Sequence, residues 1–146
     1  MTAPIHFYLT FNPFANRYAQ VGYTQAHDFY FFLKKMIVSK KSNYAYWGKM
    51  DTRNKKHSIN HLEINNIIKS NDSNGEMTYL FITDFQHLWV ANIIEVFDSI
   101  KDSENTLDFY KDKDVSIWFK VVDFTLLTNT FSQTASRLYR FYIDNN

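Results

Sequence analysis

Trp47 and Gly48 stand side by side in a chain that has only 3 tryptophans and 3 glycines. Tyr46 precedes them and Lys49 follows them, so aromatic rings, a bare backbone and a cation occur within four residues. An aromatic ring can stack on a nucleobase, which is worth about 1–3 kcal/mol per base. A glycine lets a ligand approach the backbone closely. The pattern predicts a base-binding site in which Trp47 forms a wall and Gly48 admits the edge of the base.

The most basic part of the chain surrounds this pair. Residues 34–57 hold eight Lys and Arg side chains against Asp51 alone, a net charge of +7, whereas the whole chain carries +1 and the remainder therefore −6. Such asymmetry is typical of a surface that faces a polyanion, although a solvated lysine-rich surface explains it equally well. The predicted phosphate-binding residues are Lys34, Lys35, Lys40, Lys41, Lys49, Arg53, Lys55 and Lys56.

The aromatic residues can instead belong to the core. The chain has 14 Phe, 10 Tyr and 3 Trp, and many of these can only be buried. Tyr44, Tyr46 and Trp47 can form one face and the edge of a buried strand. Trp89 has apolar neighbours in a β-rich segment and is expected to be core.

Residues that could catalyse a reaction or bind a metal form no complete group. His57 and His61 have the i, i+4 spacing of a helical metal site, but a third ligand is not evident. Asp84 is expected to form a turn rather than to act as an acid or base. The chain has no cysteine, which excludes disulfides and thiolate metal sites. We expect no enzyme activity, no metal and no cofactor, and a solvated loop for Asp108, Asp112 and Asp114.

Four β-rich segments set the frame for these residues. Strands are predicted over residues 5–11, 77–83, 87–97 and 117–124. Residues 84–86 form the tight turn of a hairpin between the second and third of these strands. The expected fold class is α+β, a small curled β-sheet or partly open barrel flanked by helices.

The helices are predicted less sharply than the strands. Residues 25–38 fit either a helix or a buried strand. Residues 58–69 are predicted to be a helix, with Ser58 as N-cap and an apolar side formed by Ile59, Leu62, Ile64 and Ile67. A short helix is expected over residues 134–143. Loops are expected over residues 12–16, 70–76 and 98–116, the last with an apolar island at residues 107–110.

At 146 residues the chain is most simply one domain spanning residues 1–146. No apolar run approaches the roughly 18 residues of a membrane span, and the first residues lack the features of a signal peptide. The absence of cysteine fits a reducing compartment, so we expect a cytoplasmic protein.

The order of these segments resembles the PUA-like superfamily, most closely its YTH and EVE branches. The resemblance runs over residues 29–124, through FYFFLKKMIV, NYAYWGKM, HLEINNIIK, the MTYLFIT and HLWVANIIEVF hairpin, LDFYK and IWFKVVDF. It is one of order and hydrophobic pattern. Its distinctive elements are Trp47 and the Trp118-Phe119-Lys120 strand.

The resemblance implies a barrel-like domain with an aromatic cage for a methylated base, of the kind found as the N-terminal module of restriction NTPases. Trp47 matches the first cage tryptophan, with Tyr46 beside it. Phe109 or Tyr110 falls where the family has its second cage aromatic, and Trp118 lies in the closing strand. The chain departs from the family where Lys34 and Lys35 replace polar amides, and no second Trp lies near residues 107–110.

Four functions remain open from the sequence. The first is a non-catalytic module that recognises a modified base flipped out of DNA, acting with a fused or separate NTPase or nuclease in a restriction or defence system. The second is an RNA-binding domain of the same fold. The third is a protein–protein interaction module, and the fourth is a small enzyme without a recognised motif.

Overall fold

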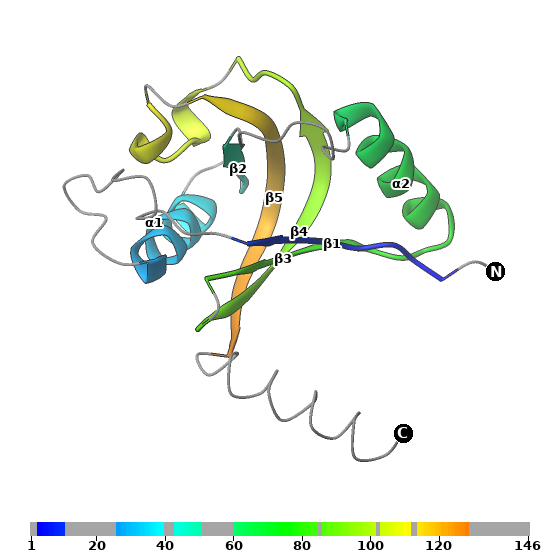
Figure 1. Ribbon diagram of the computed structural model, residues 1–146, viewed down its shortest axis with the longest axis horizontal. Helices are drawn as coiled ribbons and strands as arrows, with labels where there is room; N and C mark the ends of the chain where they lie inside the picture. The colour runs from blue at the N-terminus through cyan, green and yellow to red at the C-terminus, as the bar shows by residue number, and fades with distance from the viewer. Residues whose placement is uncertain are drawn as a thin grey trace.

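The computed structural model describes residues 3–10, 26–39, 43–50, 60–84, 86–101, 103–111 and 114–128. These residues form an α+β fold, a curled five-stranded sheet with two α-helices (Figure 1). Two short 3-10 helices, η2 and η3, connect the last two strands. In chain order the elements are β1 (Phe7–Thr10), α1 (Ala26–Ser39), β2 (Ala45–Met50), α2 (His61–Ser73), β3 (Thr78–Thr83), β4 (Leu88–Phe97), η2 (Ser103–Asn105), η3 (Asp108–Tyr110) and β5 (Val115–Thr128).

The five strands form one sheet in the order β1-β3-β4-β5-β2. β1 runs parallel to β3, and the other neighbouring strands are antiparallel. The predicted hairpin is confirmed, because β3 pairs antiparallel with β4 from Thr78 opposite Ile93 to Thr83 opposite Leu88. The predicted strand over residues 117–124 is confirmed within the longer β5. β2 and β1 lie at the two edges of the sheet.

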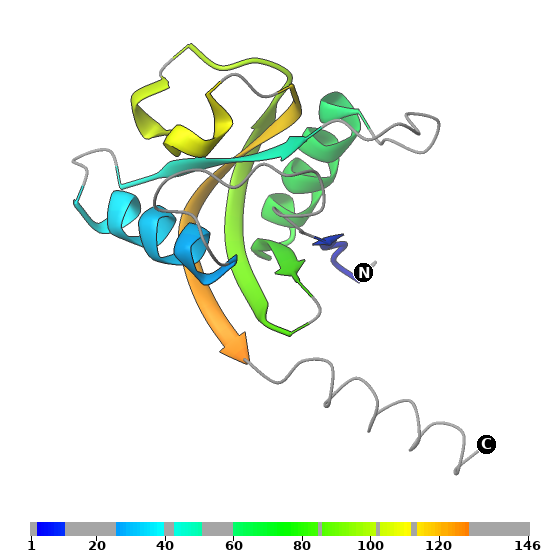
Figure 2. The ribbon, with the colours of Figure 1, turned by 60° about the vertical axis from the view of Figure 1, so that its left-hand side comes forward.

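The curl of the sheet is concentrated in its two longest strands, β4 and β5 (Figure 2). Their register shifts between Asn92 and Ile93 and again between Ile93 and Glu95. The alternation of buried and exposed side chains breaks at the same places, at Ile94–Glu95 on β4 and at Val122–Asp123 on β5. Such bulges bend a strand and increase its twist. They turn a flat sheet into a half-barrel.

The hairpin turn is built around Asp84, as the sequence predicted. Asp84 Oδ1 accepts hydrogen bonds from the backbone N–H groups of Gln86, at 3.0 Å, and His87, at 2.6 Å. The Thr83 hydroxyl donates to the carbonyl of His87 at 2.6 Å and closes the same turn. Asp84 therefore serves as a turn residue.

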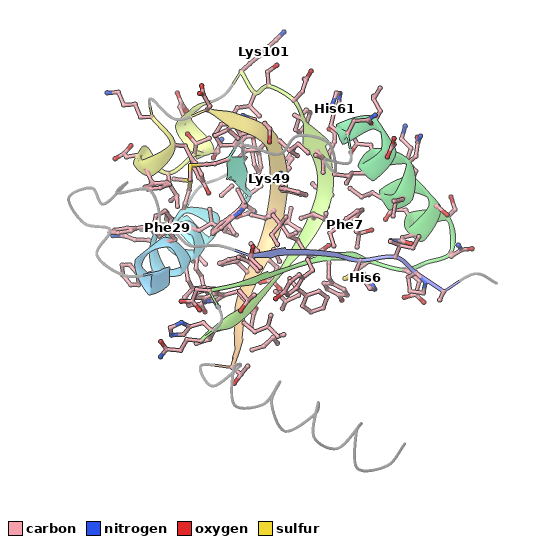
Figure 3. All side chains as sticks on the ribbon, viewed as in Figure 1. His6, Phe7, Phe29, Lys49, His61 and Lys101 are labelled. Atoms are coloured by element: carbon pink, nitrogen blue, oxygen red, sulfur yellow. The ribbon has the colours of Figure 1, made fainter. Side chains whose placement is uncertain are left out.

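Residues 26–39 form a helix, which settles the choice that the sequence left open. Phe29, Leu33 and Ile37 are buried at the i, i+4, i+8 spacing of one helix face. This face packs against β5 and β2. Phe29 meets Phe109 edge to face, with ring centroids 4.5 Å apart, and Figure 3 labels it on α1. The sequence was ambiguous here because a continuous apolar run fits a buried strand as well as a buried helix.

The prediction for α2 was correct in type and wrong in detail. The N-cap is Asn60 rather than Ser58, and its side-chain oxygen accepts a hydrogen bond from Glu63 N at 2.9 Å. The buried face consists of Ile64, Ile68 and Asn71, whereas Leu62 is 63% exposed. The helix also continues to Ser73, so the loop predicted over residues 70–76 is shorter.

Two asparagines of α2 attach this helix to the sheet through backbone groups. Asn65 donates from Nδ2 to Val96 O at 2.8 Å and accepts from Val96 N at 2.9 Å. Asn71 is buried, and its Nδ2 donates to Ile5 O at 2.9 Å and to Thr78 Oγ1 at 2.8 Å. A side-chain amide can satisfy a strand N–H and C=O pair in this way. Asn65 thereby fixes the end of β4.

The core is one contiguous cluster of apolar side chains from the sheet and both helices. Trp89 is 1% exposed within it, which confirms that this tryptophan is core. The turn predicted over residues 12–16, Ile59 and the helix predicted over residues 134–143 lie outside the residues that the structure describes. Within those residues, no helix has the length and apolar character needed to cross a bilayer.

Candidate functional site

The segment NYAYWGKM contributes the edge strand β2, and Gly48 lies opposite Trp118 of β5. A Cβ atom added to Gly48 would lie 2.9 Å from Trp118 Cζ3 and 3.0 Å from both Tyr110 Cε1 and Val115 Cγ1. Ordinary contacts of a Cβ atom begin near 3.4 Å. Because Gly48 has no side chain, these three side chains can pack directly against β2. The close approach predicted there for a base edge is made by the protein's own rings.

A series of aromatic rings leads from the core to this position. Trp47 stacks on Phe124 at 5.7 Å between ring centroids and meets Tyr110 edge to face at 6.5 Å. Tyr110 in turn meets Trp118 edge to face, with centroids 5.2 Å apart and planes at 78°. Edge-to-face pairs have a preferred geometry and add to burial energy. The orientation of Trp118 is thus fixed by a ring that is itself packed in the core.

A pocket of about 560 Å³ lies beside Trp118 and Tyr110. This volume is within the range of roughly 300–1,000 Å³ that is typical of small-ligand sites. Its apolar lining includes Leu107 and Val115 together with the two rings. Its polar lining comes from Asp98, Ser99, Thr106, Asp108 and Lys111. Among the lining residues, Trp118 is a half-buried aromatic, whereas Tyr110 is 5% exposed.

Three segments of the chain line this pocket: the residues that follow β4, the segment from Thr106 to Lys111, and the first part of β5. Asp98 and Ser99 directly follow β4, and Asn65 holds the end of that strand through its hydrogen bond to Val96. Thr106 forms an isolated parallel bridge with Tyr46 of β2, which ties the segment between the 3-10 helices to the sheet edge. Lys101 follows these pocket residues in the chain, and its side chain projects outward at the top of Figure 3. The pocket therefore depends on contacts between segments far apart in the chain.

A second pocket has a volume of about 240 Å³, and the segment from Thr106 to Asp108 lines both pockets. Helix α1 contributes Phe32, Lys35, Met36 and Ser39 to it. Lys35, one of the predicted phosphate-binding residues, is exposed at this place.

The predicted cage residues occupy different depths in the structure. Trp47 is 3% exposed, Phe109 0%, and Tyr46 and Tyr110 5% each. Rings buried to this degree pack mainly against other core side chains, and Tyr110 among them also lines the larger pocket. Trp118, which is half-buried and lines the larger pocket, is the predicted cage residue with an accessible surface. Base contact by the other four residues stays a prediction.

The predicted phosphate-binding residues are described only in part. Lys34 and Lys35 are exposed on α1, and Lys49 is half-buried on β2. Because side chains alternate along a strand, Lys49 points to the opposite side of β2 from Gly48. The remaining predicted cations, Lys40, Lys41, Arg53, Lys55 and Lys56, lie outside the described residues.

No sequence motif marks Asp98, Ser99, Thr106 or Lys111 as site residues. They lie in a polar segment whose composition predicts a loop, and the apolar island at residues 107–110 is the only sign in the sequence that this segment packs. The island is confirmed as buried, since Leu107, Phe109 and Tyr110 are all core residues. Because three residues of the island are buried, the polar residues between and beside them are held in place. The island in the sequence could therefore have indicated the pocket.

The metal candidates from the sequence are not joined by further ligands in the part of the chain that the structure describes. No group of three His, Asp or Glu side chains there could hold a metal ion. His61 is half-buried at the start of α2, while His57 and Asp112 fall outside the described ranges. His87 Nδ1 lies 2.9 Å from Asp84 Oδ2, in the hairpin turn.

Comparisons with protein-family models, with curated proteins and with solved structures each found no match to this chain. The α+β class with a curled sheet rests on the structure alone. The resemblance to the PUA-like superfamily stays a prediction.

Proposed function

We propose that this protein is a nucleic-acid-binding module that holds a single modified base, flipped out of its strand, against Trp118. The observation that supports it is the pocket of about 560 Å³ in which Trp118 and Tyr110 rest on the bare backbone of Gly48. DNA is the proposed partner, in a cytoplasmic restriction or defence system in which a fused or separate NTPase or nuclease acts on the bound site. The protein itself is proposed to be non-catalytic.

The proposal differs from the sequence hypothesis in the ring that meets the base. Trp118 is the half-buried ring beside the pocket, so it provides the stacking surface. Tyr110 and Trp47 form the support behind it, through edge-to-face contacts at 5.2 Å and 6.5 Å. A rigid support raises affinity because less side-chain freedom is lost on binding.

The energies are compatible with selective binding of one base. Stacking on an aromatic ring is worth about 1–3 kcal/mol, and a methyl group in a fitted apolar pocket adds roughly 1–3 kcal/mol. Flipping a base out of a duplex costs a few kcal/mol. Phosphate contacts must offset this cost, and the basic segment of residues 34–57 is proposed to supply them.

The direct test is a titration of labelled oligonucleotides with wild type and Trp118→Ala. The panel holds plain DNA, DNA with one N6-methyladenine or one 5-methylcytosine, and RNA of the same sequence. Loss of a stacking surface of about 1–3 kcal/mol predicts roughly fivefold to more than hundredfold weaker binding of the preferred modified strand. Binding to plain DNA should change little because its phosphate contacts remain.

Two further variants separate the parts of this site. Tyr8→Ala removes an aromatic ring that is 53% exposed on β1, away from the pocket, and should leave all affinities unchanged. The double variant Lys55→Glu/Lys56→Glu should weaken plain and modified DNA alike and reduce the salt dependence of binding. If folded Trp118→Ala protein keeps the wild-type preference for modified DNA, the proposed base site is wrong.

A further inference from the structure

The larger pocket carries an excess of negative charge that the stacking proposal does not use. Its charged lining residues are Asp98, Asp108 and Lys111, a formal charge of −1. Asp98 and Asp108 approach from different segments, one after β4 and one at the start of η3. A phosphate group would meet net repulsion here, so the part of the ligand that enters this pocket is not a phosphate.

The aromatic wall of the pocket has the same electrostatic preference. The face of an indole ring is negative because of its quadrupole, and tryptophan is the best of the aromatic residues at binding cations. Trp118 and the two carboxylates line the same pocket, and each favours a positively charged ligand there. A neutral planar ligand would use the stacking surface alone, and a flat cation would use both.

We propose that the preferred ligand of this pocket is a base that is positively charged at neutral pH, that is, a base alkylated on a ring nitrogen such as 1-methyladenine or 3-methylcytosine. This inference rests on the proposed function, because it names the class of base that the same site takes. Such a base is flat enough to stack on Trp118, and its delocalised positive charge suits a pocket that two carboxylates also line. Alkylation of the pairing edge also weakens pairing, which lowers the cost of flipping.

The expected preference is moderate because the carboxylates are exposed. Exposed ion pairs contribute about 0.2–1 kcal/mol, or roughly one and a half to fivefold for each carboxylate. A cation–π contact at an exposed site adds about two to fivefold. We expect an overall preference on the order of tenfold over a neutral base of the same size.

The test compares two isomeric bases that differ in charge. Single-stranded DNA oligonucleotides of one sequence carry either 1-methyladenine, a cation at neutral pH, or N6-methyladenine, its neutral isomer. Single strands are used so that the different pairing strengths of the two bases do not enter. Fluorescence anisotropy competition with the full chain should give about tenfold tighter binding of the cationic isomer.

Charge variants assign this preference to the pocket. Asp98→Asn/Asp108→Asn should reduce the preference, measured as the ratio of the two affinities, to about twofold or less. Asp72→Asn makes the same kind of change at an exposed position at the end of α2 and should leave the preference intact. Trp118→Ala should weaken both isomers.

The outcomes distinguish the two proposals. Equal binding of both isomers, with dependence on Trp118 retained, would overturn the cationic-base inference and leave the base-binding function standing. Binding of neither isomer would overturn both. A trimethyllysine peptide that binds more tightly than either oligonucleotide would also overturn both, since the pocket would then recognise a methylated protein.

Discussion

The contact between Gly48 and the pocket rings gives the sharpest prediction of stability. In Gly48→Ala, the new methyl group would approach Trp118, Tyr110 and Val115 at 2.9–3.0 Å, so each neighbour must move by about 0.4–0.5 Å to reach an ordinary contact of 3.4 Å. Overpacking of this kind typically costs about 1–3 kcal/mol. Replacing glycine by alanine also restricts the unfolded chain, which raises the free energy of unfolding by about 0.4–1 kcal/mol. The net loss of unfolding free energy should lie between about 0 and 2.6 kcal/mol.

Two measurements check this prediction. Urea denaturation should show the lower free energy of unfolding, and the melting temperature should fall by up to about 10 °C. The tryptophan emission of the native state should also shift, because the ring that moves is the half-buried Trp118. Adding Val115→Ala to Gly48→Ala removes one of the three crowding atoms and should recover part of the lost stability.

Gly75 supplies a control with a different physical cause. Its φ of 73° lies in the left-handed region, and no atom lies within 4 Å of an added Cβ. Gly75→Ala should therefore lose about 1 kcal/mol through backbone strain, with native tryptophan emission and ligand binding unchanged. If the Gly48→Ala protein is as stable as wild type and its tryptophan emission is unchanged, then Gly48 is not what allows the pocket rings to pack against β2.

The remaining predictions concern burial and capping. Trp47→Ala should cost about 3–5 kcal/mol of stability, because this ring is 3% exposed; a small stability loss with selective loss of modified-DNA binding would instead support the cage role. Asn60→Ala should cost about 0.5–2 kcal/mol through loss of the N-cap hydrogen bond, measured by denaturation, whereas Ser58→Ala should be neutral. Asn71→Ala should cost at least about 1–3 kcal/mol, since it leaves the Thr78 hydroxyl and Ile5 backbone without their buried partner; a neutral result would contradict that account.

Four of the five strands in the described residues were predictable because their signals are local. The β3–β4 hairpin follows from two β-rich runs around Asp84, whose side chain bonds to backbone groups only two and three residues away. The type of α1 was not predictable, since Phe29–Leu33 is apolar enough for either a helix or a buried strand. Only the packing of Phe29, Leu33 and Ile37 against β5 and β2 decides it. The start of α2 was placed at Ser58 because several cap residues precede this helix, and one of them, Asn60, makes the bond.

The chemistry of the candidate site divides in the same way. The sequence determined the residue types, an adjacent Trp47 and Gly48, a further tryptophan in a closing strand, and a basic segment, because these are properties of the chain itself. It could not determine which ring is exposed. Register across β2 and β5 places Trp118, rather than Trp47, against the pocket, and contacts over more than sixty residues of sequence bring Gly48 beneath it. Burial is a property of the assembled sheet, so only the tertiary structure could decide which aromatic residue a ligand can reach.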